Sequence, residues 1–514
     1  MAHSVLSFAQ HFHDRTKYAP ETLSRSQGAM QGAQPEPFKT YKLGTGYDLK
    51  PYLDLSLTVA QEDQRGWIRL SHLLINTYGL TARVMTMTGE PFYLRAAPSA
   101  GGLYPAEIYV ISRGTTLLPA GLYNYQARTH SLWRYWEDHV WQELQTACFW
   151  HPALEHTQLA VVVTAVFYRS AWRYQDRAYR RICLDTGHLL GNLELAGNLS
   201  DYRPHLIGGF ADGAVNQLLY LNEAEEGTIA IAALADLLQV EQNLSPVTTA
   251  QPAPTQTDFP AMVDGELLAY LHQSTCLEAS ADLRWTTRSP VGPRLETSPH
   301  TDKYNFPFCL KVSTVTDPIL WDDQLRGLET TLLGRRSTRE FSGGTLTLDE
   351  LSTVLDFTYQ PQHYVDQGCD SDPDYFDLGL IQTFVAVSGV EGLDAGCYYY
   401  APHSQELRQI RFKNFRRELH YLCLGQDLGR DAAAVIFHTA DLKQAVATYG
   451  DRVYRYLHLD AGHLGQRLNL AAIRLGLGVS GIGGFFDDQV NEVLGIPADE
   501  AALYITALGQ PAEA

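Results

Sequence analysis

The sequence predicts a protein of mixed helices and strands that is built from two tandem copies of one fold. The first observation is a repeat, because motifs of the first half return in the second half at one constant offset, from Tyr174 to Tyr449 for example. The second is the succession of helix-like amphipathic segments and short apolar runs typical of buried strands. The third is the segment 243–260, whose Pro, Thr, Gln and Ser content is typical of a linker. A chain of 514 residues is long enough for two such domains.

Five groups of residues carry the repeat. The matched pairs are Tyr174-x-Asp176-Arg177 with Tyr449-x-Asp451-Arg452, Leu184-Asp185-x-Gly187-His188 with Leu459-Asp460-x-Gly462-His463, Gly208-Gly209-Phe210 with Gly483-Gly484-Phe485, Val215-Asn216 with Val490-Asn491, and Gly121-x-Tyr123 with Gly396-x-Tyr398. A weaker echo relates His13-x-x-Thr16 to His272-x-x-Thr275. We therefore expect copy one in residues 1–245, and the linker with copy two in residues 246–514.

The elements of each copy follow from the spacing of apolar residues. Residues 1–50 are polar and rich in turns, so we expect an extended lead-in arm there. Helical periodicity and continuous apolar runs then predict, in order, a helix over 69–78, a strand after Pro105, a buried strand over 159–167, a helix from Tyr174 to about Leu199 and, in copy two, a helix over 349–359.

The overall composition narrows the class of protein. Hydrophobic residues make up 45% and charged residues 19% of the chain, and no apolar run approaches the roughly 20 residues of a membrane helix. The N-terminal segment lacks the basic and apolar regions of a secretory signal, so we expect a cytoplasmic protein. The net charge of -19 argues against a nucleic-acid partner. Seven scattered cysteines without a CxxC pair indicate neither a disulfide framework nor a zinc site.

The turn within Arg95–Val110 is the first candidate binding element. Its residues Pro98, Ser99, Ala100, Gly101 and Gly102 have little side-chain bulk, so that a flat ligand could rest against the backbone. At the same position copy two has Pro-Asp-Tyr-Phe-Asp (373–377), which is bulky and charged. Only copy one is therefore expected to offer such a platform.

A basic segment of copy two is the second candidate. It contains Arg335, Arg336, Ser337 and Arg339, and it is followed by the helix predicted over 349–359. Arginine and serine donors in this density suit a phosphate monoester, although such a turn taken alone is more often solvated surface. Copy one has Asp54-Leu55-Ser56-Leu57-Thr58 instead, and it has DYRPHL (201–206) where copy two has GLGVSG (476–481). Copy one thus lacks the basic segment, and copy two lacks the small-residue turn.

The segment PSAGGLYP (98–105) resembles the flavin-contacting signature of the SagB/ThcOx-type dehydrogenases, a branch of the FMN-dependent nitroreductase family. The resemblance implies an α+β fold and a dimer with FMN at its interface, here fused into one chain as a pseudo-twofold pair. It also implies that Arg335, Arg336, Ser337 and Arg339 hold the phosphate, with Gly481, Ile482, Gly483 and Gly484 nearby. Pro98 to Gly102 would face the ring from the other copy, which gives one FMN per chain.

The same resemblance implies a catalytic pair. SagB-type enzymes are similar in a Lys-Tyr pair to which azoline oxidation is assigned, and the matching positions here are Arg173-Tyr174 and Thr448-Tyr449. We expect Tyr174 to carry out the proton step, with Tyr449 as the counterpart in the abandoned site. Arg173 is a poor base, so we expect it to orient the substrate or to assist the adjacent phenol.

The expected function is FMN-dependent dehydrogenation of thiazoline or oxazoline rings to azoles on a modified peptide. The missing lysine favours an alternative, an FMN oxidoreductase acting on a small molecule or a carrier-tethered intermediate. A flavin-free scaffold subunit is a further alternative. The expected partners are the peptide or small-molecule substrate and other enzymes of the same pathway, with no nucleic acid or membrane.

Two other kinds of site are not expected. Asp185 with His188, and their counterparts in copy two, share a helix face but lack a third ligand, so we predict no metal. No G-x-G-x-x-G follows a predicted strand, so a dedicated NAD domain is not predicted. Reoxidation by oxygen or by a transiently bound nicotinamide are both open.

Overall fold

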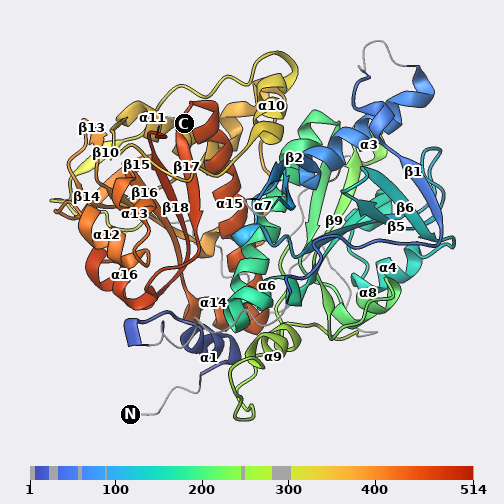
Figure 1. Ribbon diagram of the computed structural model, residues 1–514, viewed down its shortest axis with the longest axis horizontal. Coiled ribbons are helices and arrows are strands. Elements are labelled where there is room, and N and C mark those ends of the chain that lie inside the picture. Colours follow the sequence, from blue (N-terminus) through green and yellow to red (C-terminus); the bar gives the residue numbers. More distant parts are fainter. Residues whose placement is uncertain are drawn as a thin grey trace.

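A computed structural model describes residues 6–21, 23, 33–55, 61–86, 89–242, 244, 249–279 and 302–512. Within these residues the chain forms two sheets of seven strands, and both sheets have the same strand order. Neighbouring strands are antiparallel in both sheets, and helices flank them (Figure 1). The predicted α+β class and the tandem duplication are confirmed.

The copy-one sheet has the order β1-β6-β5-β4-β7-β9-β8. Its strands, in that order, are Thr45–Asp48, Ser131–Trp136, Gly121–Gln126, Ala106–Ser112, Leu159–Val166, Glu226–Asp236 and Tyr202–Ile207. A separate hairpin consists of β2 (Leu80–Met85) and β3 (Pro91–Arg95). The helices are α1 (Phe8–Arg15), α3 (Glu62–Tyr78), α4 (Trp141–Ala147), α5 (Ala153–His156), α6 (Phe167–Tyr174), α7 (Ala178–Leu199) and α8 (Asp212–Leu218).

The copy-two sheet repeats this pattern as β10-β15-β14-β12-β16-β18-β17. Its strands, in that order, are Lys311–Ser313, Glu406–Arg411, Gly396–Ala401, Gln382–Val387, Ala434–Asp441, Glu500–Gly509 and Gly478–Ile482. The two-residue strands β11 (Leu346–Thr347) and β13 (Val390–Glu391) pair in parallel. The helices are α9 (Leu267–Ser274), α10 (Arg326–Gly334), α11 (Leu348–Tyr359), α12 (Arg416–Leu422), α13 (Asp427–Asp431), α14 (Leu442–Tyr449), α15 (Val453–Arg474) and α16 (Asp487–Leu494).

The two copies meet along α7 and α15, which lie side by side at the centre of the molecule (Figure 1). Their closest approach is at the equivalent glycines Gly187 and Gly462. A Cβ on Gly187 would meet the Gly462 Cα at 2.9 Å, and a Cβ on Gly462 would meet the Gly187 Cα at 3.0 Å. The duplicated Gly-His motif is therefore a helix-crossing motif, and the packing is reciprocal as a pseudo-twofold pair requires.

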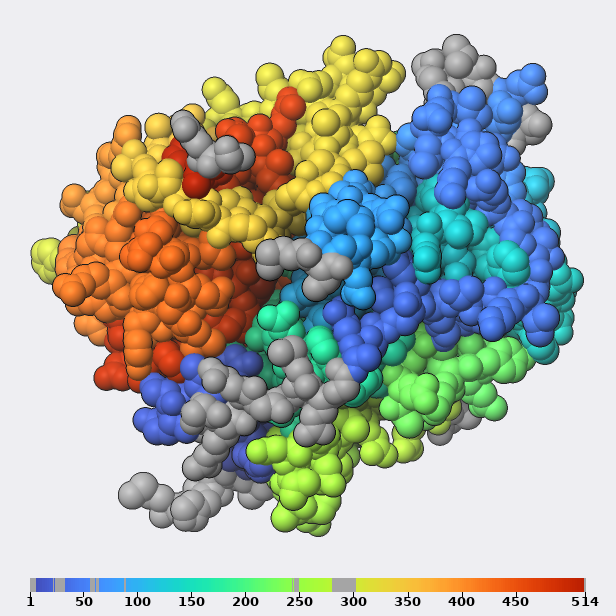
Figure 2. Space-filling model, in the orientation of Figure 1, coloured from blue at the N-terminus to red at the C-terminus, as the bar shows by residue number. Residues whose placement is uncertain are grey.

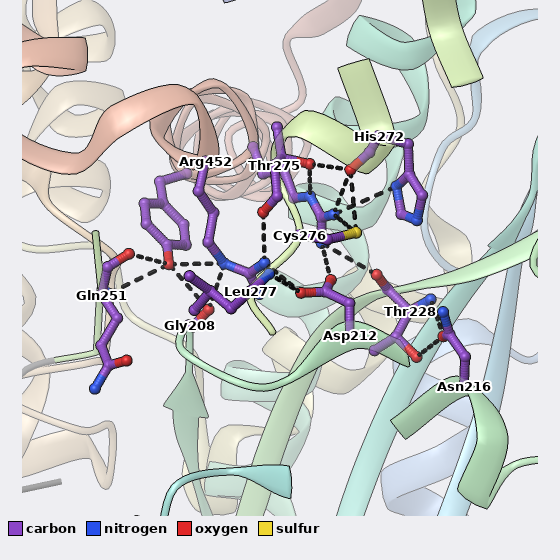
Figure 3. Close-up of polar contacts among 12 residues, drawn as sticks. Gly208, Asp212, Asn216, Thr228, Gln251, His272, Thr275, Cys276, Leu277 and Arg452 are labelled. Carbon is purple, nitrogen blue, oxygen red and sulfur yellow. Dashed lines mark hydrogen bonds and ion pairs between the residues drawn. The ribbon is translucent and has the colours of Figure 1, made fainter. Parts of the chain in front are cut away.

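Two equivalent buried clusters lock the copies together. In one, Asp212 of copy one accepts hydrogen bonds at 2.7 Å from Arg452 and from Arg455, both on the copy-two side (Figure 3). In the other, Asp487 of copy two accepts from Arg177 at 2.9 Å and from Arg180 at 2.7 Å. The two aspartates occupy equivalent positions of the repeat, and so do the arginines. Burial alone would raise the pKa of each carboxyl, but the two guanidinium groups that face it keep that pKa below the usual range.

The arginine clusters explain why His13-x-x-Thr16 is weakly repeated as His272-x-x-Thr275. Thr275 at the end of α9 accepts from Arg455 through its hydroxyl and from Arg452 through its carbonyl (Figure 3). Thr16 at the end of α1 receives the same two bonds from Arg180 and Arg177. The arm is therefore not wholly extended as expected, since Phe8–Arg15 is a helix with a Ser7–Gln10 capping box.

Two further expectations differ from the structure. The helix predicted from Tyr174 is interrupted, because α6 ends at Tyr174 and α7 begins at Ala178. Gln175 between them has φ 49°, which an α-helix does not accommodate. The described part of the predicted linker, 249–260, does not hang free. Ala253 donates its N–H to the Tyr449 carbonyl at 2.9 Å, and the Gln256 N–H bonds to Asp451 at 2.8 Å. Among the described helices, none is both long and apolar enough to cross a membrane.

Candidate functional site

A cavity of about 790 Å³ lies between the two copies. Both candidate segments line it. The sequence-predicted residues among the lining are Pro98, Ser99, Ala100, Gly101, Gly102, Arg173, Tyr174, Arg335, Arg336, Ser337, Arg339, Gly481, Gly483 and Gly484. Of the predicted site residues, Ile482 and Tyr449 are not among the lining residues. The structure therefore brings together segments that lie far apart in the chain, one in each copy.

A buried carboxylate, that of Asp185, binds the small-residue turn Pro98–Gly102. Asp185 on α7 accepts a hydrogen bond from the Ser99 hydroxyl at 2.5 Å and from the Ala100 N–H at 3.0 Å. Burial raises the pKa of Asp185 to about 7. The duplicated Asp-x-x-His motif therefore positions a turn, which is a structural role that the sequence did not define.

The glycines of the turn are required by geometry. Gly101 and Gly102 have φ 65° and 66°, in the left-handed region that favours glycine. A Cβ on Gly101 would lie 2.8 Å from the Tyr174 hydroxyl and 3.3 Å from Arg173 Nη1, and a Cβ on Gly102 would collide with the Phe92 ring. The turn thus presents bare backbone next to Tyr174 and Arg173.

Two of the predicted phosphate-binding arginines also tie the copies together. Arg335 is 3% exposed and donates from Nε to the Ala96 carbonyl at 2.7 Å and from Nη2 to the Arg95 carbonyl at 3.1 Å. Arg336 donates to the hydroxyl and the carbonyl of Thr81 in the β2–β3 hairpin. In Figure 2 this light-blue hairpin lies against the yellow segments of copy two. Burial lowers the pKa of Arg335 to about 10, so the guanidinium stays charged at neutral pH.

The remaining donors of the basic segment line the cavity and have no partner among the described residues. Ser337 and Arg339 line it, and neither side chain makes a hydrogen bond or an ion pair to any described residue. Nη1 of Arg335 likewise has no bond to the described part of the chain. These groups are the ones that can bind an anion, whereas Arg336 is mainly a tether.

The GIGG segment borders the cavity from copy two. Gly481 and Gly483 have no room for a side chain, because a Cβ would collide with the Tyr504 hydroxyl and with Arg181 Nη1, respectively. Ile482 is buried and packs into the copy-two core, so its side chain does not belong to the site. The alternation of a strand end explains this difference, since neighbouring residues of β17 point to opposite faces.

Arg181 is the residue that sequence reasoning missed. It lies on the first turn of α7, is 6% exposed and lines the cavity. Its guanidinium carbon stands 3.9 Å from the centre of the Tyr174 ring, while that of Arg173 stands 5.6 Å from it. The signal was present in the repeat, because copy two has Tyr456 at the position of Arg181.

The equivalent position between the copies is filled with side chains. Tyr375 stacks on His463 with ring centres 4.3 Å apart, and Phe376 stacks on Tyr456 at 4.9 Å. Tyr449 donates its hydroxyl to Asp377 at 2.9 Å, and burial raises its pKa. Tyr449 therefore lies in this filled site and away from Tyr174, so the structure does not support grouping the two as one catalytic set.

The Asp-x-x-His pairs for which we predicted no metal lie on α7 and α15. Within the described ranges, no group of three or more His, Cys, Asp or Glu side chains is arranged to hold a metal ion. His188 hydrogen-bonds Gln466 and Tyr504, each at 2.9 Å, and burial lowers its pKa to about 3. His188 is thus a neutral, hydrogen-bonded residue of the cavity lining.

The chemistry of the described lining suits a flat anionic ligand. Among these residues the cavity has five arginines and a single carboxylate, Asp185, which is already engaged by the turn. The small-residue turn Pro98–Gly102 offers a surface for a ring, and Ser337 with Arg339 offers donors for a phosphate. The residues present therefore fit a flavin mononucleotide.

Comparison with known proteins identifies the fold. The chain is 32% identical over 186 residues to "Putative nitroreductase MJ1384" of Methanocaldococcus jannaschii, which covers 36% of this chain and 92% of that protein. A crystal structure of a "putative nitroreductase" from Anabaena variabilis matches 98% of this chain and all of that chain at 65% identity, with a TM-score of 0.93. The sequence profile of the nitroreductase family matches residues 71–234 and again 332–510. The chain therefore belongs to the nitroreductase family, whose domain it contains twice.

Proposed function

We propose that the protein is an FMN-dependent oxidoreductase that dehydrogenates azoline rings, thiazoline or oxazoline, to azoles on a modified peptide. The observation that carries the proposal is a single cavity lined by the turn Pro98–Gly102 of copy one and by Ser337, Arg339 and Gly483 of copy two. The family membership of both halves supports a flavin oxidoreductase. The azoline substrate rests on the resemblance of the PSAGGLYP segment.

We assign the phosphate-binding role to the donors that make no hydrogen bond to the described residues. Ser337, Arg339 and Nη1 of Arg335 would hold the phosphate. The backbone of Ala100 to Gly102 would contact the flavin ring, and Gly481, Gly483 and Gly484 line the same cavity. When bound, FMN supplies a two-electron acceptor that can take a hydride from a substrate carbon. Because Asp185 holds the turn and Arg335 holds the residues before it, this platform is ordered before any ligand enters.

The proton step is assigned to Tyr174. Oxidation of an azoline to an azole removes one proton and one hydride from adjacent ring atoms, so the protein must accept the proton. The Tyr174 hydroxyl stands directly over the bare backbone of Gly101, and the phenol is half-buried at the end of α6. Arg173 remains protonated and is suited to orienting the substrate.

The proposal is tested on the purified full-length protein. Flavin released by denaturation should approach one FMN per chain, and incubation with a thiazoline-containing peptide should lower the peptide mass by two hydrogens per oxidised ring. A colourless protein that takes up no FMN would support the scaffold alternative and contradict an enzyme of this type.

A second candidate function is an FMN oxidoreductase that acts on a small molecule or a carrier-tethered intermediate. The observation that favours it is Arg173, because guanidinium stands where the azoline-oxidising branch has lysine. A flavin-loaded protein that leaves azoline peptides unchanged but is reduced by a small-molecule donor would favour this candidate over the first.

A further inference from the structure

The cavity lining contains a buried guanidinium, that of Arg181, which has no hydrogen-bond or ion-pair partner among the described residues. Arg181 is 6% exposed, its Nε makes no hydrogen bond, and no ion pair joins the guanidinium to a described carboxylate. Burying a guanidinium without a partner is costly, so such a group is generally satisfied by a ligand or by water. The position of Arg181 in the lining makes a ligand accessible to it.

The neighbours of Arg181 do not neutralise it. The adjacent carboxylate, Asp185, binds the Ser99 hydroxyl and the Ala100 N–H, and burial raises its pKa to about 7. On the other side lies the Tyr174 ring, which contributes a cation–π contact and no countercharge. Arg173, which lines the same cavity, adds a second guanidinium beside this ring.

The filled site shows that this charge is not needed for the fold. At the constant offset of the repeat, Arg181 corresponds to Tyr456 and Arg173 corresponds to Thr448. Tyr456 stacks on Phe376 and its hydroxyl bonds to the Gly208 carbonyl at 2.9 Å, so a neutral side chain satisfies the same helix position. Both arginines occur only beside the open cavity.

We propose that Arg181 and Arg173 form an anion subsite next to Tyr174, which binds a carboxylate of the substrate while the reacting ring lies within reach of the Tyr174 hydroxyl. This inference rests on the proposed flavin site, and it adds a substrate class, namely molecules with a carboxylate near the ring to be oxidised. A planar guanidinium at this place can pair with a carboxylate through two hydrogen bonds. The subsite uses residues of copy one, whereas the phosphate donors Ser337 and Arg339 belong to copy two.

The test measures binding to the FMN-loaded protein. Benzoate and its neutral analogue benzamide are titrated separately while the absorbance of the bound flavin is followed. Wild type should bind benzoate about 10- to 100-fold more tightly than benzamide, as a charge-assisted contact predicts. Arg181→Gln should abolish this preference and Arg181→Lys should keep part of it, with each variant measured after it has been saturated with FMN.

Controls separate this inference from the proposed function. Arg417→Gln removes an exposed arginine that does not line the cavity and should leave the preference for benzoate intact. Arg339→Gln should weaken FMN binding without altering the preference in the loaded protein. Equal binding of benzoate and benzamide by wild type would overturn the inference, as would loss of FMN in place of loss of preference in both Arg181 variants. Failure of wild type to bind FMN at all would instead contradict the proposed function.

Discussion

The two composite sites between the copies have opposite contents although they share one architecture. In each, an α7 or α15 aspartate receives backbone N–H bonds from the turn of its own copy: Ala100 donates to Asp185, and Phe376 and Asp377 donate to Asp460. Above the first turn lies an open cavity, and above the second lie stacked aromatic rings. The scaffold is therefore the same, and the side chains alone decide whether a ligand can enter.

This difference teaches how a duplicated pair can lose one of its two sites. A site made from both copies needs a platform from one copy and anion donors from the other, so a loss in either copy removes it. An empty cavity would cost packing energy, and Tyr375, Phe376 and Tyr456 remove that cost by filling the space. The reciprocal arginine clusters at Asp212 and Asp487 are retained in both halves because they hold the copies together.

The largest difference in turnover is expected between substitutions of two tyrosines at equivalent positions of the repeat. Tyr174→Phe should reduce turnover of a thiazoline peptide by about 10²- to 10⁴-fold, because it removes the proton-transfer group over the Gly101 backbone. Tyr449→Phe should leave turnover near wild type, since its hydroxyl only bonds Asp377. Rates and bound-flavin spectra measured on both variants check this. The opposite ranking would show that the reaction takes place in the site that we regard as filled.

The aromatic filling should matter for stability and not for flavin. Phe376 is 4% exposed and occupies the position equivalent to Gly101, so Phe376→Ala should lower the free energy of unfolding by about 3–5 kcal/mol. Denaturant unfolding measures the loss, and flavin extraction should still give one FMN per chain. If the variant instead bound a second FMN, the filled site would be a closed form of a working site.

Substitutions of the two phosphate-binding arginines, Arg339 and Arg335, should differ less strongly, and they should differ in whether stability changes together with FMN affinity. Arg339→Ala should weaken FMN binding by about 10- to 100-fold, the loss expected for one hydrogen-bonded charge, without changing the unfolding midpoint of the FMN-free protein. Arg335→Ala should lower both the affinity for FMN and the unfolding midpoint, because Arg335 also donates hydrogen bonds to the Ala96 and Arg95 carbonyls of the other copy. Fluorescence titration with FMN and thermal unfolding distinguish the two effects. Unchanged FMN affinity in Arg339→Ala would remove this residue from the site.

The last contrast concerns Asp185 and Asp460, the equivalent aspartates of the two sites, and it is the smallest effect per pH unit. Burial raises the pKa values of Asp185 and Asp460 from 3.8 to about 7, so between these values the folded protein holds protons that the unfolded chain releases. Their contribution to stability is therefore present below about pH 4 and is lost as pH rises through about 7, by at most about 1.4 kcal/mol per pH unit for each group. Asp185→Asn and Asp460→Asn should each flatten the pH dependence of unfolding over this range. A variant with the wild-type slope would show that its aspartate is ionised throughout.

Much of the fold could be predicted from local patterns. The strand β7 and the helix α11 follow from apolar runs and helical spacing, because such patterns reflect burial on a sheet or on one helix face. The break at Gln175 could not be predicted, since a positive φ at a glutamine depends on the packing of α6 against α7. The Ser7–Gln10 capping box was a local signal for α1, but the contacts of this short helix with residues far away in sequence could not be predicted from local patterns.

By itself, the sequence determined the duplication, the α+β class and the reciprocal loss of the small-residue turn and the basic segment, because these are patterns along the chain. Only the tertiary structure decided which donors remain available. It showed that Arg335 and Arg336 bind backbone of the other copy and that Ile482 and Tyr449 lie away from the cavity. It also showed that Arg181 lines the cavity with no hydrogen-bond or ion-pair partner among the described residues. The physical reason is that the availability of a side chain depends on neighbours brought in from the other copy, and no spacing along one chain encodes those contacts directly.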